Sequence, residues 1–316
     1  MPQGCVSATV DLKDRDQDVE AAMPFGTGAP KIEEGDRVLL FHTPDAPEAQ
    51  QWQFMDFDRS RVIYALVALF AAAVLLLSRL RGVTSLASLG ISLALVIWFV
   101  LPNLLLSTPP LLVAVVASSA IMIVSLYLGH GFSAMTSAAL VGTLLSLGLT
   151  GLIGGLFTAA ANFTGFSNEQ VGYLAAIQGG LNYEGLVLAA MLIGALGVLD
   201  DVTVTQTAAV WELSAADPTA SRWTVFAGAM RIGREHVTAA VNTLVLAYTS
   251  ALLPLLLLLV LVSSSFDDAL LSEGIALEVA RGLIGSLGII AAVPITTLVA
   301  VLVAGARRGR YAHLDD

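Results

Sequence analysis

The chain has 316 residues, of which 56% are hydrophobic and 13% are charged, with a mean hydropathy of +0.81. Soluble domains average about 45–50% apolar and about 25% charged residues, so the composition excludes an ordinary soluble enzyme and a disordered chain. A net charge of −10 also argues against a nucleic-acid-binding module, which needs a basic face. Cys5 is the single cysteine, which rules out an internal disulfide and a thiolate metal cluster. We therefore expect a polytopic membrane protein.

Residues 1–58 form a polar, acidic segment with 12 acidic and four basic side chains. The segment does not open with the basic stretch and apolar run of a signal peptide. The pattern at residues 37–42 predicts a β-strand, and a second strand is predicted at residues 8–12. Two strands are too few for a stable sheet, so we expect a small, incomplete extracytoplasmic β-module.

Seven apolar runs follow, and each is about as long as a helix that crosses a bilayer. Backbone groups in lipid must be hydrogen-bonded internally, and the runs do not alternate as barrel strands do, so we expect helices. The sequence thus predicts an all-α membrane bundle over residues 59–306 and a cytosolic tail at residues 307–316. The predicted spans lie near residues 62–80, 86–106, 111–128, 135–159, 185–205, 237–262 and 283–304.

Arginines in the short loops predict the orientation of the spans, because basic loops stay in the cytoplasm. They follow the first span, lie between the fifth and sixth spans, and follow the seventh: Arg79, Arg81, Arg222, Arg231, Arg234, Arg307, Arg308 and Arg310. The intervening loops are almost free of basic residues. This pattern predicts an N-terminus outside and a C-terminus inside. Residues 171–181 are too short to cross and are expected to lie on the outer surface or to re-enter.

Polar side chains concentrate at the end of the fifth span. If residues 185–213 form one helix, Asp201 shares a face with Thr205 and Glu212, and Asp200 shares a second face with Thr203 and Thr207. Carboxylate and hydroxyl oxygens are ligands for hard cations, and carboxylates also bind protons. We therefore expect a solute- or ion-binding site in the inner half of the bundle. Its expected ligands are Asp200, Asp201, Thr203, Thr205, Gln206 and Asn242; the sequence does not identify a metal.

The entry to the sixth span carries a matching set of polar residues. Arg231, Glu235, Thr238 and Asn242 repeat on one helix face. We expect Asp200, Asp201 or Glu212 to pair with Arg231 or Arg234. The expected charge-pairing or gating residues are Glu212, Arg231, Arg234, Glu235 and His236.

Structural roles would also explain these residues. Asp200 and Asp201 would then cap a separate cytosolic helix at residues 202–213, because acidic residues favour helix N-termini. Arg231 and Arg234 would then serve only as cytosolic anchors of the sixth span.

Several kinds of chemistry have no motif in this sequence. There is no phosphate-binding loop for ATP, no H-E-x-x-H zinc motif and no G-x-S-x-G nucleophile turn. An intramembrane aspartyl protease needs aspartates on two helices, whereas Asp200 and Asp201 share one. We therefore expect no enzymatic activity, no cofactor, no ATP use and no nucleic-acid partner. The expected partners are the lipid bilayer and a second copy of the chain or another membrane subunit.

Two long stretches are similar to a known family, namely GALGVLDDVTVTQTAAVWEL at residues 194–213 and RIGREHVTAAVNTLVLAYTSALLPLLLL at residues 231–258. Shorter matching pieces are FMDFDRS at 54–60, SRLRGVTSLASLGISL at 78–93, GHGFSAMT at 129–136 and GSLGIIAAVPITT at 285–297. On these motifs the chain resembles the YibE/YibF-like family of bacterial multipass membrane proteins, over about residues 31–304.

The resemblance implies a polytopic inner-membrane protein with an extracytoplasmic N-terminal domain. Members usually begin with an additional transmembrane helix, which this sequence lacks, so we expect a shortened start. Transport is the activity commonly suggested for the family. With the polar cluster, this leads us to expect a secondary transporter or permease for a small solute or inorganic ion, in the bacterial cytoplasmic membrane, with its site between the fifth and sixth spans. The alternative is a membrane scaffold or accessory subunit without transport activity of its own.

Overall fold

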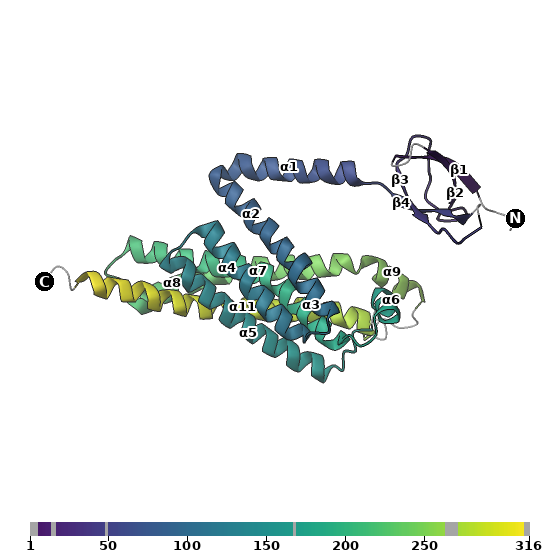
Figure 1. The fold of residues 1–316 in the computed structure, drawn as a ribbon. Helices are drawn as coiled ribbons and strands as arrows, with labels where there is room; N and C mark the ends of the chain where they lie inside the picture. The colour runs from purple at the N-terminus through teal and green to yellow at the C-terminus, as the bar shows by residue number, and fades with distance from the viewer. Residues whose placement is uncertain (1–5, 14–16, 48–49, 167–168, 263–270, 313–316) are drawn as a thin grey trace. The chain divides into compact units, whose positions relative to one another are not determined.

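The computed structural model describes residues 6–13, 17–47, 50–166, 169–262 and 271–312. The chain divides into two compact units, Met1–Arg79 and Leu80–Asp316 (Figure 1). The first unit contains a small β-sheet and one helix, and the second contains the remaining helices. The structure therefore combines a helical bundle with a separate N-terminal sheet, as the sequence predicts.

Four strands form one sheet in the N-terminal unit, in the order β1–β2–β4–β3. The two hairpins β1–β2 and β3–β4 are antiparallel, and a short parallel pairing of Ala22 with Gln53 joins them. The strands are β1 Val6–Leu12, β2 Gln17–Met23, β3 Val38–His42 and β4 Trp52–Phe57.

Two of these strands match the predicted segments at residues 8–12 and 37–42, but the expected total of two strands is wrong. The sequence does not predict β2, because Gln17, Asp18 and Glu20 give it a polar first half and only Ala21 and Met23 are buried. β4 carries the alternation of a strand in WQFMDF, with Trp52 stacked on His42 of the neighbouring strand. Four strands are enough for a sheet with one covered face.

α1 (Ser60–Ser78) follows the sheet, and none of its residues is buried. Its sequence is apolar on every side, which is typical of a helix that lies in lipid. Asp58 Oδ1 accepts a hydrogen bond from the Ser60 N–H at 2.9 Å, just before the helix begins. The hydrogen bonds from Ser60 hold the pKa of Asp58 below its ordinary value, and the Arg59 guanidinium does the same for the pKa of Asp56.

The elements of the second unit are all helical in the described ranges. A π-helical turn, η2, connects α2 and α3 into one continuous rod. Their bounds are α2 Leu80–Leu95, η2 Val96–Val100, α3 Leu101–Leu105, α4 Pro110–His130, α5 Ala134–Ala160, α6 Glu169–Ile177, α7 Tyr183–Ala216, α8 Arg222–Ala251, α9 Leu253–Val262 and α11 Glu273–Ala312.

Six helical segments within the described ranges are long and apolar enough to cross a membrane: α1, α2–α3, α4, α5, α7 and α11. α8 and α9 together would make a seventh, although they meet at a bend of 57°. Helices of this length and hydropathy match the thickness of a bilayer core. The fold is thus that of a polytopic membrane bundle, with six or seven spans by length and composition.

Three helices have bounds that differ from the predicted spans. α7 continues without a break through Asp200 and Asp201, so these residues do not cap a new helix at 202–213. α8 begins 15 residues before the predicted sixth span and ends at Ala251, just before Pro254 and the bend. α11 already begins at Glu273 and extends to Ala312, which places residues 273–282 and 307–312 in a helix rather than in a loop and a tail.

The centre of the bundle lies where α4, α5, α7, α8 and α11 pack together, around large buried side chains such as Leu192, Leu199 and Ile289. α5 and α11 approach each other closely, because a Cβ atom on Gly142 would lie 3.0 Å from the Cβ of Thr296. Gly288 of α11 leaves the corresponding space for Thr150 of α5. Close contacts of small residues are the usual way in which membrane helices associate.

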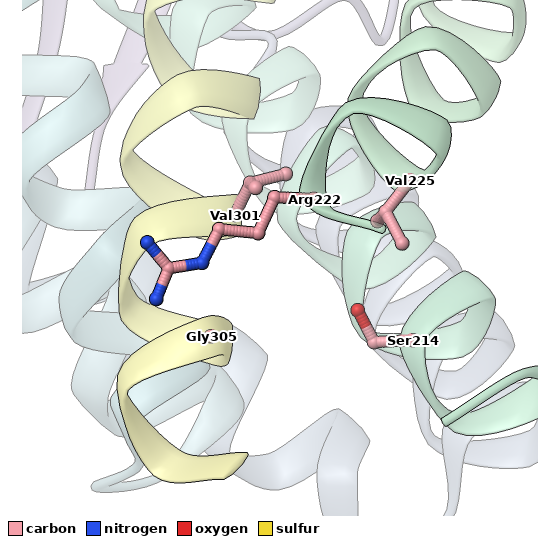
Figure 2. Close-up of a pocket in the computed structure, with 5 residues that line it drawn as sticks. All are labelled: Ser214, Arg222, Val225, Val301 and Gly305. Atoms are coloured by element: carbon pink, nitrogen blue, oxygen red, sulfur yellow. The ribbon is translucent and has the colours of Figure 1, made fainter. Parts of the chain in front are cut away.

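A second apolar cluster joins the ends of α7, α8 and α11, around Val210, Val225 and Val301. A cavity of about 190 Å³ opens beside it (Figure 2). Arg222 extends across the cavity toward Gly305 of α11, where a Cβ atom would lie 3.0 Å from the guanidinium carbon. The packing of α7, α8 and α11 against one another therefore continues along the helices well past Asp200.

Candidate functional site

The polar residues of α7 divide into two faces, as the helical spacing predicts. Asp200 is partly buried, and Thr203 and Thr207 are fully buried on the same stripe. Asp201 and Glu212 of the other stripe are exposed, and Thr205 is partly exposed. The two stripes therefore meet different surroundings and do not form one ligand set.

Asp200 points into the bundle and is held by α4. Ser125 Oγ donates a hydrogen bond to Asp200 Oδ2 at 2.9 Å, while Oδ1 is buried and has no hydrogen-bond partner among the described residues. His130, the last residue of α4, lies close enough to act electrostatically on the same carboxylate. Ser125 lies five residues before that helix end, or about 8 Å along the axis at the usual rise. Asp200 thus lies beside the apolar part of α4.

Hydroxyl groups continue the polar surroundings of Asp200 toward α5. Thr203 Oγ1 donates to the backbone carbonyl of Asp200 at 3.1 Å and lies 2.6 Å from Thr143 Oγ1. Thr207 Oγ1 lies one turn further on, where it donates to the carbonyl of Thr203. One carboxylate oxygen without a partner and several buried hydroxyls make a site at which a proton or a small cation could be bound.

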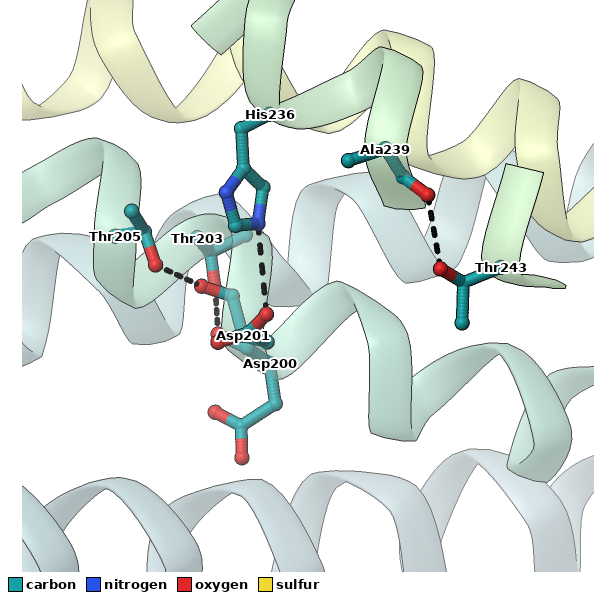
Figure 3. Close-up of polar contacts among 7 residues, drawn as sticks. All are labelled: Asp200, Asp201, Thr203, Thr205, His236, Ala239 and Thr243. Carbon is teal, nitrogen blue, oxygen red and sulfur yellow. Dashed lines mark hydrogen bonds and ion pairs between the residues drawn. The ribbon is translucent and has the colours of Figure 1, made fainter. Parts of the chain in front are cut away.

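Asp201 points away from Asp200 and faces α8 (Figure 3). Its Oδ2 lies 3.4 Å from His236 Nε2, and its side chain is 73% exposed. Thr205 Oγ1 donates to the backbone carbonyl of Asp201 at 2.7 Å, so its proton is already engaged there. Asp201 and Thr205 therefore belong to a partly open α7–α8 contact rather than to the pocket of Asp200.

Gln206 has a structural role that the sequence did not reveal. Its side-chain amide donates to the carbonyl of Ala229 in α8 at 2.8 Å and to Thr297 Oγ1 in α11 at 2.7 Å. Gly233 leaves room for this amide, because a Cβ atom there would lie 2.7 Å from Gln206 Oε1. Gln206 thus links three helices, and its NH₂ group is not free to bind a solute.

The expected ion pairs with the arginines of α8 are wrong. In the described part of the chain, Asp201 pairs with His236, Asp200 has no basic partner within ion-pair distance, and Arg231 and Arg234 are exposed. The reason is the rotation of α8: Gly233 faces α7 and α11, so side chains one or two residues away point outward. Glu212, Glu235 and Asn242 are also exposed and do not contribute to the site of Asp200.

Two contacts of the site have no recognisable signal in the sequence, whereas a third contact, within α11, has one. Ser125 and Thr143 are single hydroxyls in apolar spans, and only their positions opposite α7 identify them as partners of Asp200 and Thr203. Arg281 donates to Glu278 at 2.5 Å inside α11, where a loop was expected. Its i, i+3 spacing with Glu278 was a signal in the sequence.

Two further observations limit what the site can be. No cluster of three or more His, Cys, Asp or Glu side chains that could hold a metal ion exists within the described ranges. The cavity of Figure 2 is lined by Ser214, Arg222, Val225, Val301 and Gly305, and Asp200 does not contribute to it. The candidate site is therefore defined by the contacts of one carboxylate and not by a large cavity.

Long apolar helices around an internal carboxylate are typical of a membrane protein with a polar site in its helical bundle. The family described as YibE/F-like protein matches residues 66–306, which is most of the chain and includes α7, α8 and most of α11. The chain belongs to this family. No curated protein and no solved structure matches the chain.

Proposed function

We propose that this protein is a secondary transporter or permease for a small solute or an inorganic ion, with Asp200 as its central binding group. One observation carries the proposal: a carboxylate lies inside an apolar bundle, where, among the residues that the structure describes, one hydroxyl holds it and its second oxygen has no partner. Ionisable groups at membrane depth are costly to bury and usually mark a path for an ion or a solute.

The roles of the neighbouring residues follow from their contacts. Ser125 and the Thr143–Thr203 pair would fix the carboxylate and offer hydroxyl oxygens to a bound cation or proton. His236 and Asp201 form a partly exposed contact one helix face away, through which protons could enter or leave. We propose that both pairs act without a nucleotide or a cofactor, in a secondary mechanism without enzymatic activity.

We place the bundle in the bacterial cytoplasmic membrane with the N-terminal sheet outside and the C-terminus of α11 inside. The support is the distribution of basic residues over the loops. Arg222, Arg231 and Arg234 lie at the same end of the bundle as Arg307 and Arg308 of α11, because α7, α8 and α11 pack together there. Under this orientation the site of Asp200 lies in the cytoplasmic half of the membrane.

Solute-driven proton movement in reconstituted liposomes tests the proposal. Liposomes with an internal pH-sensitive dye receive, one at a time, a panel of inorganic cations, inorganic anions and small organic acids. At least one solute should move protons through the wild-type protein, and Asp200→Asn should abolish that signal. Glu212→Gln is the matched control, since Glu212 is exposed on the same helix and does not contribute to the site of Asp200, so this variant should keep a measurable flux.

The alternative is a scaffold or accessory subunit, in which Asp200 only positions α4 against α7. It would be favoured if the panel produced no proton movement and the protein purified with a stable partner in fixed stoichiometry. In that case Asp200→Asn should weaken the complex rather than a flux.

A further inference from the structure

α8 is an unusual membrane helix, because its outward face is more polar than its inward face. It is 30 residues long, yet it counts as a membrane span only together with α9. Its apolar residues Val237, Leu244 and Tyr248 pack inward against the core of the bundle. The side chains that it presents outward would meet lipid if the protein were a monomer.

The outward face of α8 can be defined by its rotation. Gly233 packs against α7 and α11, and nine further residues bring the helix to Asn242, about 180° away. Residues on this far side recur at intervals of one or two turns, and all are exposed: Arg231, Glu235, Thr238, Asn242 and Thr249. We call this set the outer face of α8.

Asn242 is the residue of the outer face that most needs a partner. The hydroxyls of Thr238 and Thr249 donate to carbonyls of their own helix, four residues earlier, and the adjacent Thr243 does the same toward Ala239 (Figure 3). For the Asn242 amide, by contrast, the structure records no hydrogen bond among the described residues. An amide in hydrocarbon without a hydrogen bond is costly, and asparagine in membrane helices usually bonds across to another helix.

We propose that the outer face of α8 is the interface of a homodimer, in which the two Asn242 amides bond to each other. Two copies with the same orientation in a membrane are related by an axis along the membrane normal, so equal residues meet at equal depth. An amide carries both a donor and an acceptor and is therefore complementary to itself. The occupant that best matches Asn242 is thus a second Asn242.

The charges at one end of the same face support this occupant. Arg231 and Glu235 lie one turn apart on the outer face, and neither forms an ion pair within its own chain among the described residues. In a parallel pair of α8 helices, Arg231 of each copy would face Glu235 of the other, which gives two equivalent ion pairs. Thr238, between the charges and Asn242, is small enough for close helix approach. The dimer is independent of the transport proposal, since its contacts do not include Asp200.

Cysteine cross-linking in native membranes tests the dimer. Cys5→Ser removes the single native cysteine, and Asn242→Cys is then introduced and oxidised with copper phenanthroline. We expect a band at twice the monomer mass for Asn242→Cys. Leu145→Cys is the control, because Leu145 is an exposed apolar residue of α5 and should give at least about tenfold less dimer.

Several results would overturn the proposal. Equal cross-linking at positions 145 and 242 would mean random collisions. Full labelling of Asn242→Cys by a water-soluble maleimide, without a dimer, would mean that the face lines a water-filled path. A band of another mass would identify a different protein as the occupant. Neither labelling nor cross-linking would mean that another part of the same chain covers the face.

A second measurement distinguishes the loss of the Asn242 amide contact from a loss of the folded structure. Asn242→Leu should lower the dimerisation constant in liposomes about tenfold, whereas Asn242→Gln keeps the amide and should retain most of the dimer. Both variants should fold, because position 242 is exposed in the monomer. Equal dimerisation of the wild-type protein and Asn242→Leu would contradict the proposed amide contact.

Discussion

Asp200 and Asp201 are neighbours in the chain, but a step of about 100° along α7 turns their side chains toward different surroundings. Asp200 meets a serine of α4 inside the bundle, and Asp201 meets a histidine of α8 at its edge. The spacing of polar residues predicts the two stripes. It does not predict which stripe faces inward, because this depends on the helices that pack against α7.

The hydrogen bond from Ser125 should stabilise the protein measurably. Ser125→Ala removes the recorded donor of Asp200 Oδ2 and leaves both carboxylate oxygens without a protein partner. We expect a loss of about 1–3 kcal/mol in the free energy of unfolding, which thermal unfolding in detergent would detect. Ser119→Ala is the control, because Ser119 lies on the same helix, is also partly exposed and donates only to a carbonyl of its own helix. Equal losses for both variants would contradict this role of Ser125.

Gly233 should tolerate no side chain. In Gly233→Ala the new methyl group would lie 2.5 Å from Val293 Cγ1 and 2.7 Å from Gln206 Oε1, which forces α8 away from α7 and α11. We expect a destabilisation of about 1–3 kcal/mol, measured by thermal unfolding. Gly197→Ala is matched to it, since nothing lies within 4 Å of the added atom. That variant should be neutral or more stable, by up to about 1 kcal/mol, because alanine favours a helix.

At the scale of elements, the apolar runs predict nearly every long helix, because the required length and hydropathy are set by the bilayer. Their ends were harder to predict. α7 and α11 extend beyond the apolar residues since they continue to pack on α8 around Val210 and Val301. The polar residues at these ends are typical of loops when only the sequence is considered, but tertiary contacts keep them in the helices.

The strands of the N-terminal sheet could also be predicted only in part. Val38–His42 follows a turn and alternates, so it is readily predicted. Gln17–Met23 exposes acidic side chains, and its pairing with β1 and β4 holds it in the sheet. The local alternation of side chains does not reveal pairing with a strand that is distant in the chain.

The start of α1 should lose its carboxylate contact in acid. The pKa of Asp58 is lowered by the hydrogen bonds from Ser60, so the contact contributes stability above the ordinary pKa of about 3.9. This contribution to the free energy of unfolding is lost as the pH falls from about 3.9 past the lower pKa that Asp58 has in the folded chain. The amide resonance of Ser60 in an NMR titration should report this midpoint.

Asp58→Asn keeps an oxygen that can accept from the Ser60 N–H but removes the titrating group. The amide of Ser60 should then show no transition in this range. A wild-type midpoint at or above the ordinary value for aspartate would contradict the role given to Ser60.

At the scale of the whole molecule, two polar residues of the bundle need partners that the described contacts do not fully supply. Asp200 lies between α4 and α7, and Asn242 lies on the outer face of α8. The sequence predicts that both residues need partners. It suggested one common site for them, whereas the rotation of α8 separates them and leaves Asn242 for an interface.

The accessibility of the two aspartate positions tests the central claim most directly. In a Cys5→Ser background, Asp200→Cys and Asp201→Cys are treated with a membrane-impermeant methanethiosulfonate in vesicles of each orientation. Asp201→Cys should react from the cytoplasmic side, and Asp200→Cys should react at least about tenfold more slowly. Equal, fast reaction at both positions would place Asp200 in open water and contradict a binding group inside the bundle.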